Sequence, residues 1–136
     1  MDDLMKALHE CYRHEQTMVV RYLNFSVLVG GLDRLHLAEL FRKNADDSMG
    51  HAGKVGSKIV AQGGVPQGKV GEDLAAVPGD AVRMLEQALK DEQAAVALYE
   101  AAIPLAKKDL ALRETLVHIL KEEQASVDEL RLLLRK

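Results

Sequence analysis

The pattern Glu15-Gln16-x-x-Val19-x-x-Tyr22 occurs a second time in this chain as Glu92-Gln93-x-x-Val96-x-x-Tyr99. Spacings of three and four residues place side chains on one face of a helix, so each copy predicts a helix whose apolar stripe carries a glutamate. The two copies lie in opposite halves of the chain. We therefore expect the halves to fold alike, each around a glutamate that faces the interior.

Apolar and small residues recur at helical spacing in four segments, two in each half of the chain. The first segment ends at Gly30-Gly31 and the second at Gly63-Gly64, because glycine adopts the backbone conformation that commonly follows a helix. Asp33, Asp80 and Asp109 stand where the second, third and fourth helices need N-caps. Each helix should be about 27 residues long, or about 40 Å at 1.5 Å per residue.

The connections between the helices predict the topology. Short joints make the first two helices one antiparallel hairpin and the last two another. Between the hairpins, a segment up to about Gly79 is rich in glycine and proline, which indicates an irregular connection. About fifteen residues, at roughly 3.3 Å each when extended, span the length of a helix. We therefore expect an all-α fold, a four-helix bundle of two antiparallel hairpins joined by a long crossover, with residues 1–136 as one domain. Pro104 should bend the last turns of the third helix, because its ring removes a backbone donor.

Composition excludes several functional classes. The 136 residues carry a formal charge of -3, with 29% charged and 48% apolar residues and no basic stripe, so no nucleic-acid partner is expected. The acidic start Met1-Asp2-Asp3 is unlike a signal peptide, and no apolar run is long enough to span a bilayer. We expect a cytoplasmic protein with no membrane contact. The lone Cys11 lies on an apolar stripe and should be a small core residue.

Polar residues interrupt each apolar stripe at its middle. They are Glu15 in the first helix, Ser48 and His51 in the second, Glu92 in the third, and Glu123 and Ser126 in the fourth. Burial of carboxylates without compensation is costly, and carboxylates that lie close together repel one another. We predict that Glu15, His51, Glu92 and Glu123 form a metal site. The alternatives are carboxylates paired with an Arg or Lys from a neighbouring helix and a core histidine bonded to a backbone carbonyl.

This arrangement resembles the ferritin-like superfamily, and within it the bacterioferritin-like di-iron carboxylate proteins. In these proteins two helices each provide a Glu, and the other two each provide a Glu-x-x-His, around a pair of irons. The stretches Met49–Val55 and Ile59–Pro66 also resemble the second helix of bacterioferritin-like proteins. The resemblance covers essentially the whole chain, and it implies Glu15, His51, Glu92 and Glu123 as the metal ligands.

Two positions depart from the family pattern. Ser48 stands where the second helix should provide a bridging Glu, and Ser126 where the fourth should provide a His. Three carboxylates and one imidazole suit one divalent ion better than two. Asp47 lies about 100° round its helix from Ser48, so it would need a local bulge to reach the layer, and Asp46 and Glu122 have the same difficulty. Oxygen and imidazole ligands suit iron, with manganese and zinc as alternatives.

The resemblance implies iron handling or ferroxidase-type redox chemistry, with dioxygen or peroxide as the oxidant. The alternative is a non-catalytic ferritin-like scaffold or interaction protein with a degenerate or single-ion site, which Ser48 and Ser126 favour. A third hypothesis is an oxygenase that acts on an organic substrate, which would need an open cavity beside the metal. Whether the site is catalytic is left open by the sequence, and no catalytic residue is assigned.

Glycine inside a helix costs about 1 kcal/mol relative to alanine, so three glycines in one helix require an explanation. Gly50, Gly53 and Gly56 predict a surface without side chains on the second helix. A second copy could approach closely there, so we expect a homodimer or a larger homo-oligomer. Met49 matches the position of the haem-ligating methionine in bacterioferritins, but it is a single residue, and haem is not expected.

The remaining histidines and tyrosines are expected to have structural roles. His9, His14, His36 and His118 lie off the polar layer, where solvated helix positions are the simplest explanation. Tyr22 and Tyr99 should be core aromatics whose hydroxyl groups need hydrogen-bond partners.

Overall fold

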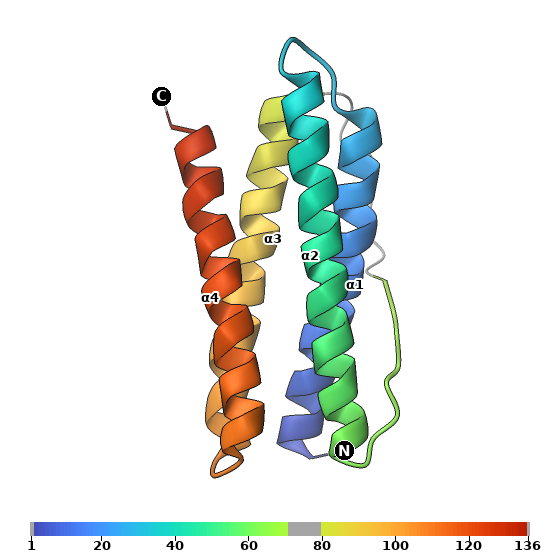
Figure 1. Cartoon of the computed structure of the whole chain (residues 1–136), viewed down its shortest axis with the longest axis vertical. Coiled ribbons are helices and arrows are strands. Elements are labelled where there is room, and N and C mark those ends of the chain that lie inside the picture. Colours follow the sequence, from blue (N-terminus) through green and yellow to red (C-terminus); the bar gives the residue numbers. More distant parts are fainter. Residues whose placement is uncertain (1, 71–79, 136) are drawn as a thin grey trace.

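The computed structural model describes residues 2–70 and 80–135, and helices make up all the regular structure within these ranges. The four long helices are α1 (Asp3–Leu28), α2 (Arg34–Ala61), α3 (Ala81–Ala102) and α4 (Leu110–Leu133). They pack along their lengths as a bundle (Figure 1). The predicted all-α four-helix bundle is confirmed. In the described ranges, no helix is both long enough and apolar enough to cross a membrane.

The predicted N-caps are present at the helix starts. The side chain of Asp80 accepts a hydrogen bond from the Arg83 backbone N–H at 3.2 Å, and that of Asp109 accepts one from Leu112 at 3.1 Å. Asp33 occupies the N-cap position of α2 but makes no side-chain capping bond. Its backbone has φ of -94° and ψ of 15°, whereas a capping residue is normally extended, so its carboxylate is not turned toward the first helical N–H groups.

The third helix is shorter than predicted, with 22 residues against about 27. It ends at Ala102 and continues as a single 3-10 segment, η1 (Ile103–Ala106). Pro104 lies in this segment and has no N–H to donate to the preceding turn, so the α-helical ladder stops there. Pro104 therefore ends the α-helix instead of bending it.

The topology is that of two antiparallel hairpins, α1–α2 and α3–α4 (Figure 1). After α2 the chain turns back and residues 64–70 run along α1. Arg13 Nε donates to the Gln67 carbonyl at 3.1 Å, and the Lys69 backbone N–H donates to Gln16 Oε1 at 3.2 Å. These bonds follow α1 toward its C-terminal end, the end at which α3 begins (Figure 1). The rest of the predicted crossover, residues 71–79, lies outside the described residues.

One of the three glycines of α2 does not form the bare surface that the sequence predicted. A Cβ on Gly50 or Gly53 would meet no atom within 4 Å, but a Cβ on Gly56 would lie 3.0 Å from Cε1 of Tyr12. Gly56 is buried and allows α1 to pack closely against α2. Its lack of a side chain thus serves the inside of the hairpin, whereas Gly50 and Gly53 face outward.

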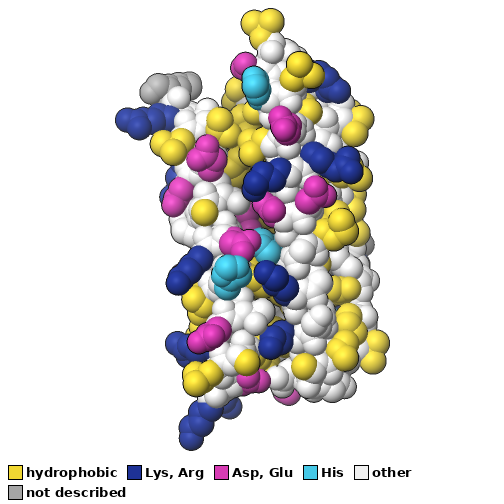
Figure 2. Space-filling model, in the orientation of Figure 1, with side chains coloured by type: hydrophobic (Ala, Val, Ile, Leu, Met, Phe, Trp, Pro, Cys, Tyr) yellow, Lys and Arg dark blue, Asp and Glu magenta, His cyan; other side chains and the backbone are white. Residues whose placement is uncertain are grey.

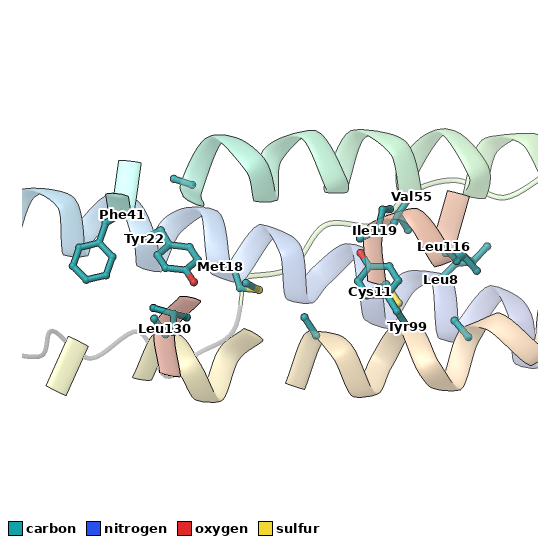
Figure 3. Close-up of a cluster of buried hydrophobic side chains, with 14 of the residues drawn as sticks. Leu8, Cys11, Met18, Tyr22, Phe41, Val55, Tyr99, Leu116, Ile119 and Leu130 are labelled. Atoms are coloured by element: carbon teal, nitrogen blue, oxygen red, sulfur yellow. The ribbon is translucent and has the colours of Figure 1, made fainter. Parts of the chain in front are cut away.

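The buried apolar side chains lie in two groups along the bundle (Figure 3). Tyr22, Phe41 and Leu130 belong to one group, and Leu8 and Leu116 to the other (Figure 3). All five are buried, as is Cys11, which lies in the core as predicted. The polar residues that interrupt the middle of each apolar stripe lie between these two groups. Apolar packing on both sides therefore holds that level in a water-poor interior.

Candidate metal centre

Each helix brings one acid or histidine of the predicted set to the same level of the bundle. Glu15 comes from α1, His51 from α2, Glu92 from α3 and Glu123 from α4, and none of the four is more than 5% exposed. Each occupies the middle of its apolar stripe, which points its side chain toward the bundle axis. The structure thus brings all four predicted residues into one buried layer.

Three of these residues form a compact cluster. One ligand atom from each of Glu15, His51 and Glu123 lies within 4.8 Å of the others. The Nδ1 atom of His51 is 2.7 Å from Glu123 Oε1 and 3.3 Å from Glu15 Oε2. Despite these short distances, none of these atoms has a hydrogen-bond partner of acceptable geometry. Buried polar atoms are nearly always hydrogen-bonded, so such a group of orphaned atoms indicates a missing partner.

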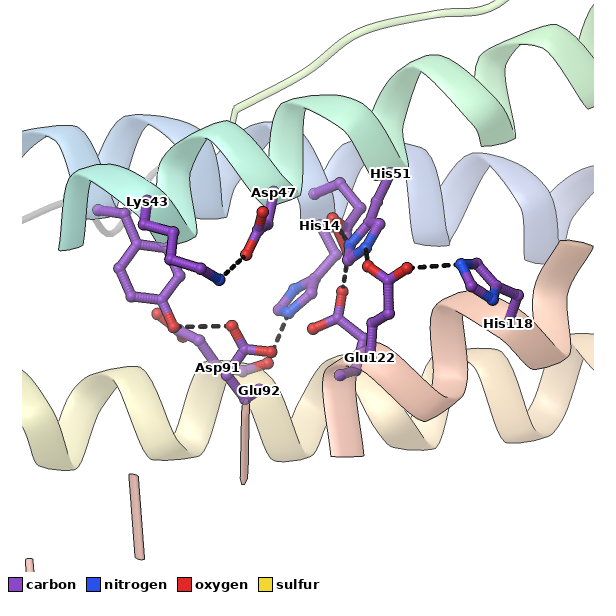
Figure 4. Close-up of polar contacts among 11 residues, drawn as sticks. His14, Lys43, Asp47, His51, Asp91, Glu92, His118 and Glu122 are labelled. Carbon is purple, nitrogen blue, oxygen red and sulfur yellow. Dashed lines mark hydrogen bonds and ion pairs between the residues drawn. The ribbon is translucent and has the colours of Figure 1, made fainter. Parts of the chain in front are cut away.

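Glu122 also reaches the cluster, which the sequence analysis did not predict. Its Oε2 atom is 2.8 Å from Nε2 of His51, although its side chain is 43% exposed and α4 is regular there. Its other oxygen, Oε1, is 2.6 Å from Nε2 of the exposed His118 (Figure 4). No bulge is needed, because a long side chain at the flank of α4 spans the short distance to the facing helix. The contact occupies Nε2 of His51 and directs Nδ1 to the buried carboxylates.

Glu92 lies to one side of this cluster. Its Oε1 atom accepts a hydrogen bond from the Tyr22 hydroxyl at 2.7 Å, while its Oε2 atom is buried without a partner (Figure 4). It lines a cavity of about 20 Å³ together with His51, Glu123 and the two serines at positions 48 and 126. A cavity of this size has room for about one water molecule or one small ion.

The two tyrosines of the repeated pattern are buried core residues, as predicted, and each turns toward the other half of the chain. Tyr22 in α1 bonds to Glu92 in α3. Burial and the nearby charge of Glu15 raise the pKa of Tyr99 in α3 well above its ordinary value. The repeat therefore places each tyrosine beside the glutamate of the opposite copy, although the Tyr99 hydroxyl makes no hydrogen bond.

Burial and mutual contact shift the acid–base behaviour of the layer. Burial raises the pKa of Glu92 to about 10, and contact with Glu123 adds to the rise. Burial also raises the pKa of Glu123 to about 7, although His51 opposes the rise. For His51, burial lowers the pKa, but contacts with Glu123 and Glu15 outweigh it and raise the pKa to about 11. At neutral pH the metal-free layer therefore holds protons on Glu92 and His51.

Two of the four other histidines differ from the solvated positions expected for them. His9 is buried, with Nδ1 3.0 Å from the Met5 carbonyl and Nε2 3.2 Å from the Val65 carbonyl. His14 is half-buried and lies 2.8 Å from the Asp91 carbonyl (Figure 4). His118 is exposed but bonded to Glu122, and His36 alone is simply exposed. Helical periodicity could not show that the crossover covers His9 or that α3 covers His14.

Known proteins of the ferritin-like family share this fold. The ferritin-like domain of the Ferritin family matches residues 5–136. A ferritin-like, diiron-carboxylate protein from Bacillus anthracis str. Ames superposes with a TM-score of 0.90 at 26% identity, over 99% of this chain and 100% of that chain. The bacterioferritin-related protein from Bacteroides fragilis, a dodecameric thioferritin, superposes with a TM-score of 0.87 over 96% and 84%; at 22% identity this likeness shows the fold alone. A search of curated proteins gave no match.

We predict that the metal-free protein loses stability as the pH rises from about 5 to about 9. Glu92, Glu123 and His51 bind their protons more tightly in the folded than in the unfolded chain. Their stabilisation is therefore complete below the ordinary pKa values and is lost as the pH climbs toward the raised ones. Melting temperatures from circular dichroism, measured with a chelator present, test this.

Glu92→Gln should flatten this decline, because glutamine keeps the neutral form of the side chain at every pH. The matched control is Glu86→Gln, which removes an exposed acid from the same helix and should follow the parent. The pH explanation is wrong if the parent and Glu92→Gln lose stability with the same slope.

Proposed function

The chain belongs to the ferritin-like domain family, and on that premise we propose that it binds a divalent metal ion. Iron is the proposed metal, and the proposed function is iron handling or ferroxidase-type redox chemistry. One observation carries the proposal. The ligand atoms of Glu15, His51 and Glu123 gather within 4.8 Å in the interior and lack hydrogen-bond partners. A bound cation would give these atoms the partner that they lack and would offset the repulsion between the carboxylates.

The residues present fit one such ion. Carboxylate oxygen and imidazole nitrogen are ligands for iron, manganese and zinc. Glu15, His51 and Glu123 would hold the ion, and Glu92, which borders the same cavity, is the proposed fourth ligand. Glu122 has a positioning role, because its bond to Nε2 of His51 leaves Nδ1 for the metal.

The fit to a pair of ions is poor. Ser48 and Ser126 line the cavity beside Glu92, at the positions where the family pattern has a second Glu and a second His. Neither hydroxyl brings negative charge, so a second ion would have too few strong ligands. We therefore propose one tightly held ion per chain.

Bound iron would supply one-electron redox chemistry with dioxygen or peroxide as the oxidant. The chain contributes a buried set of ligands from which bulk water is excluded, and groups that hold exchangeable protons. Because His51 and Glu92 carry protons in the metal-free protein at neutral pH, ion binding must release protons, and it should weaken at low pH. The second candidate function, a non-catalytic scaffold that keeps a single ion, is favoured by Ser48 and Ser126.

His51→Ala and Glu123→Ala should each weaken metal binding by at least about tenfold, because each removes one of three clustered ligands. The helices should still form, since the apolar groups on both sides of the layer are untouched. Titration with Zn²⁺ and far-UV circular dichroism on the same samples test both points. His36→Ala and Glu114→Ala, which remove exposed residues from α2 and α4, serve as controls. Binding as tight as that of the parent in both site variants would place the metal elsewhere.

Restoring the two family ligands should change the number of ions held. The double variant Ser48→Glu with Ser126→His should raise the stoichiometry from one ion per chain toward two and increase the rate of iron oxidation. Without metal, Ser48→Glu alone should destabilise the bundle, because it adds a carboxylate to a buried acidic layer. Anaerobic Fe²⁺ titration followed by admission of oxygen measures both quantities. Equal stoichiometry and oxidation rates in parent and double variant would show that the serines are irrelevant.

A second copy of the chain is the proposed partner at the outer face of α2. A groove of about 960 Å³ lies between α1, α2 and the first part of the crossover, with the outward-facing Gly53 in its wall. Met49 and Val60 also line it and are 58% and 59% exposed, which is unusual for large apolar residues in one place. The Bacteroides fragilis protein, which has the same fold, is dodecameric, so this fold is compatible with self-association.

Gly53→Arg should reduce the oligomer to a smaller species, because it places a charged side chain in the centre of this proposed interface. The substitution has open space in the single chain, so the bundle should still fold. Ala97→Arg, at an exposed position of α3, is the matched control. Light scattering after size-exclusion chromatography measures the mass of each variant. A parent protein that is monomeric, or an unchanged mass for Gly53→Arg, would contradict this assembly.

A further inference from the structure

A cleft between α2 and α4 opens at the level of the polar layer. It has a volume of about 340 Å³ and is bordered by residues of both helices. Four of its lining residues, Asn44, Asp47, Glu122 and Ser126, also line the cavity of about 20 Å³ beside Glu92. The cleft and the cavity are therefore adjacent, and these four residues form the wall between the surface opening and the buried layer.

The inner end of this passage carries buried carboxylate oxygens that make no hydrogen bond. Glu92 Oε2 and Glu123 Oε1 are buried without hydrogen bonds, and both residues line the small cavity. Each residue is only 2% exposed. A ligand that follows the cleft inward thus ends at Glu92 Oε2 and at Glu123 Oε1, which faces His51 Nδ1 at 2.7 Å. Carboxylate oxygens of this kind are ligands for a divalent cation.

The outer part of the passage is acidic. Asp47, Glu122 and Glu129 line the cleft, and its single lysine, Lys43, is already paired with Asp47 at 2.7 Å. Figure 2 shows acidic and histidine side chains together along the seam between α4 and α2, with lysine and arginine side chains beside them. Between the acidic mouth and the buried end, the wall offers the neutral oxygens of Asn44 and Ser126. Such oxygens contact a passing cation without holding it strongly.

The other large openings in the described part of the chain are less suitable. A cleft of about 560 Å³ farther along α4 is lined by Lys54 and Lys58, and it shares no lining residue with the small cavity. The apolar groove beside α1 shares none either. Of these three openings, the acidic cleft alone shares wall residues with the cavity of the polar layer.

We propose that the α2–α4 cleft is the path by which a divalent cation enters and leaves the buried layer. The proposal rests on the proposed function, because it presumes that the layer binds an ion. The acidic residues at the mouth concentrate cations near the opening.

A bulky side chain in the cleft tests the path. Ala125 is exposed on α4 and lines the cleft, and Ala125→Phe would obstruct it without replacing a ligand. A path affects association and release equally, so both Co²⁺ rates should fall roughly tenfold or more while Kd stays unchanged. Ala111→Phe, exposed on the same helix but bordering the lysine-lined cleft, is the matched control and should behave as the parent.

Tyrosine fluorescence supplies the signal. The chain has three tyrosines and no tryptophan, and Tyr22 and Tyr99 lie beside the polar layer, so bound Co²⁺ should quench the emission. Stopped-flow mixing gives the association rate, mixing of the loaded protein with excess chelator gives the release rate, and equilibrium titration gives Kd. Far-UV circular dichroism checks that each variant is folded.

A second variant tests whether the acidic residues at the outer end of the cleft speed the association of the cation. It also tests the path if Ala125→Phe does not fold. Asp47→Asn with Glu129→Gln should slow Co²⁺ association roughly three- to tenfold at low ionic strength, and the difference should shrink in high salt. Glu114→Gln, on the wall of the lysine-lined cleft, is the control and should leave the rate unchanged.

The outcomes separate the path from the site. If the parent binds no Co²⁺, both the proposed function and the path are overturned. If the parent binds Co²⁺ but Ala125→Phe and the double charge variant match their controls, the path is wrong while the site stands. A change in Kd without a matched change in both rates would also overturn the path, because it would show that Ala125→Phe acts on the site itself.

Discussion

Three carboxylates and one imidazole lie at one level of a bundle whose interior is mostly apolar, and the charge of this layer is the constraint on which the rest depends. Glu15, Glu92 and Glu123 repel one another in an interior of low polarity. In the metal-free chain, a proton on Glu92 and the positive charge of His51 offset the repulsion between the carboxylates. Several buried polar atoms of the layer still make no hydrogen bond. The apolar groups on both sides supply the stability that this layer costs.

The tyrosine of each copy of the internal repeat lies beside the glutamate of the other copy. Tyr22 of the first half bonds to Glu92 of the second, and Tyr99 of the second lies close enough to Glu15 of the first for its charge to raise the tyrosine pKa. The two hairpins are thereby linked through the layer itself. Symmetry ends at α2 and α4, where the first half keeps the histidine, His51, and the second keeps the acid, Glu123. Together α2 and α4 therefore supply one Glu and one His, which is half of what two complete Glu-x-x-His motifs would supply.

The helix α2 separates two surfaces of different character. On its outer face Gly53 lies in the wall of an apolar groove, where we propose that a second copy binds. The side that faces α4 borders an acidic cleft that shares wall residues with the cavity of the layer, the proposed path of the cation. Self-association at the first surface would leave the second open to solvent. Assembly and access to the buried site can therefore coexist on one helix.

The sequence by itself determined the number of helices, most of their ends and the four residues that meet in the layer, because helical spacing, aspartate caps and glycine or proline stops are local properties. It also located Ser48 and Ser126 as the departures from the family pattern. Tertiary structure decided the contacts at the flanks of the helices. Glu122 reaches His51, His9 is covered by the crossover, and Gly56 receives Tyr12. Periodicity specifies which way a side chain leaves its helix, whereas these contacts depend on the distance to the neighbouring helix and on the length of the side chain that spans it.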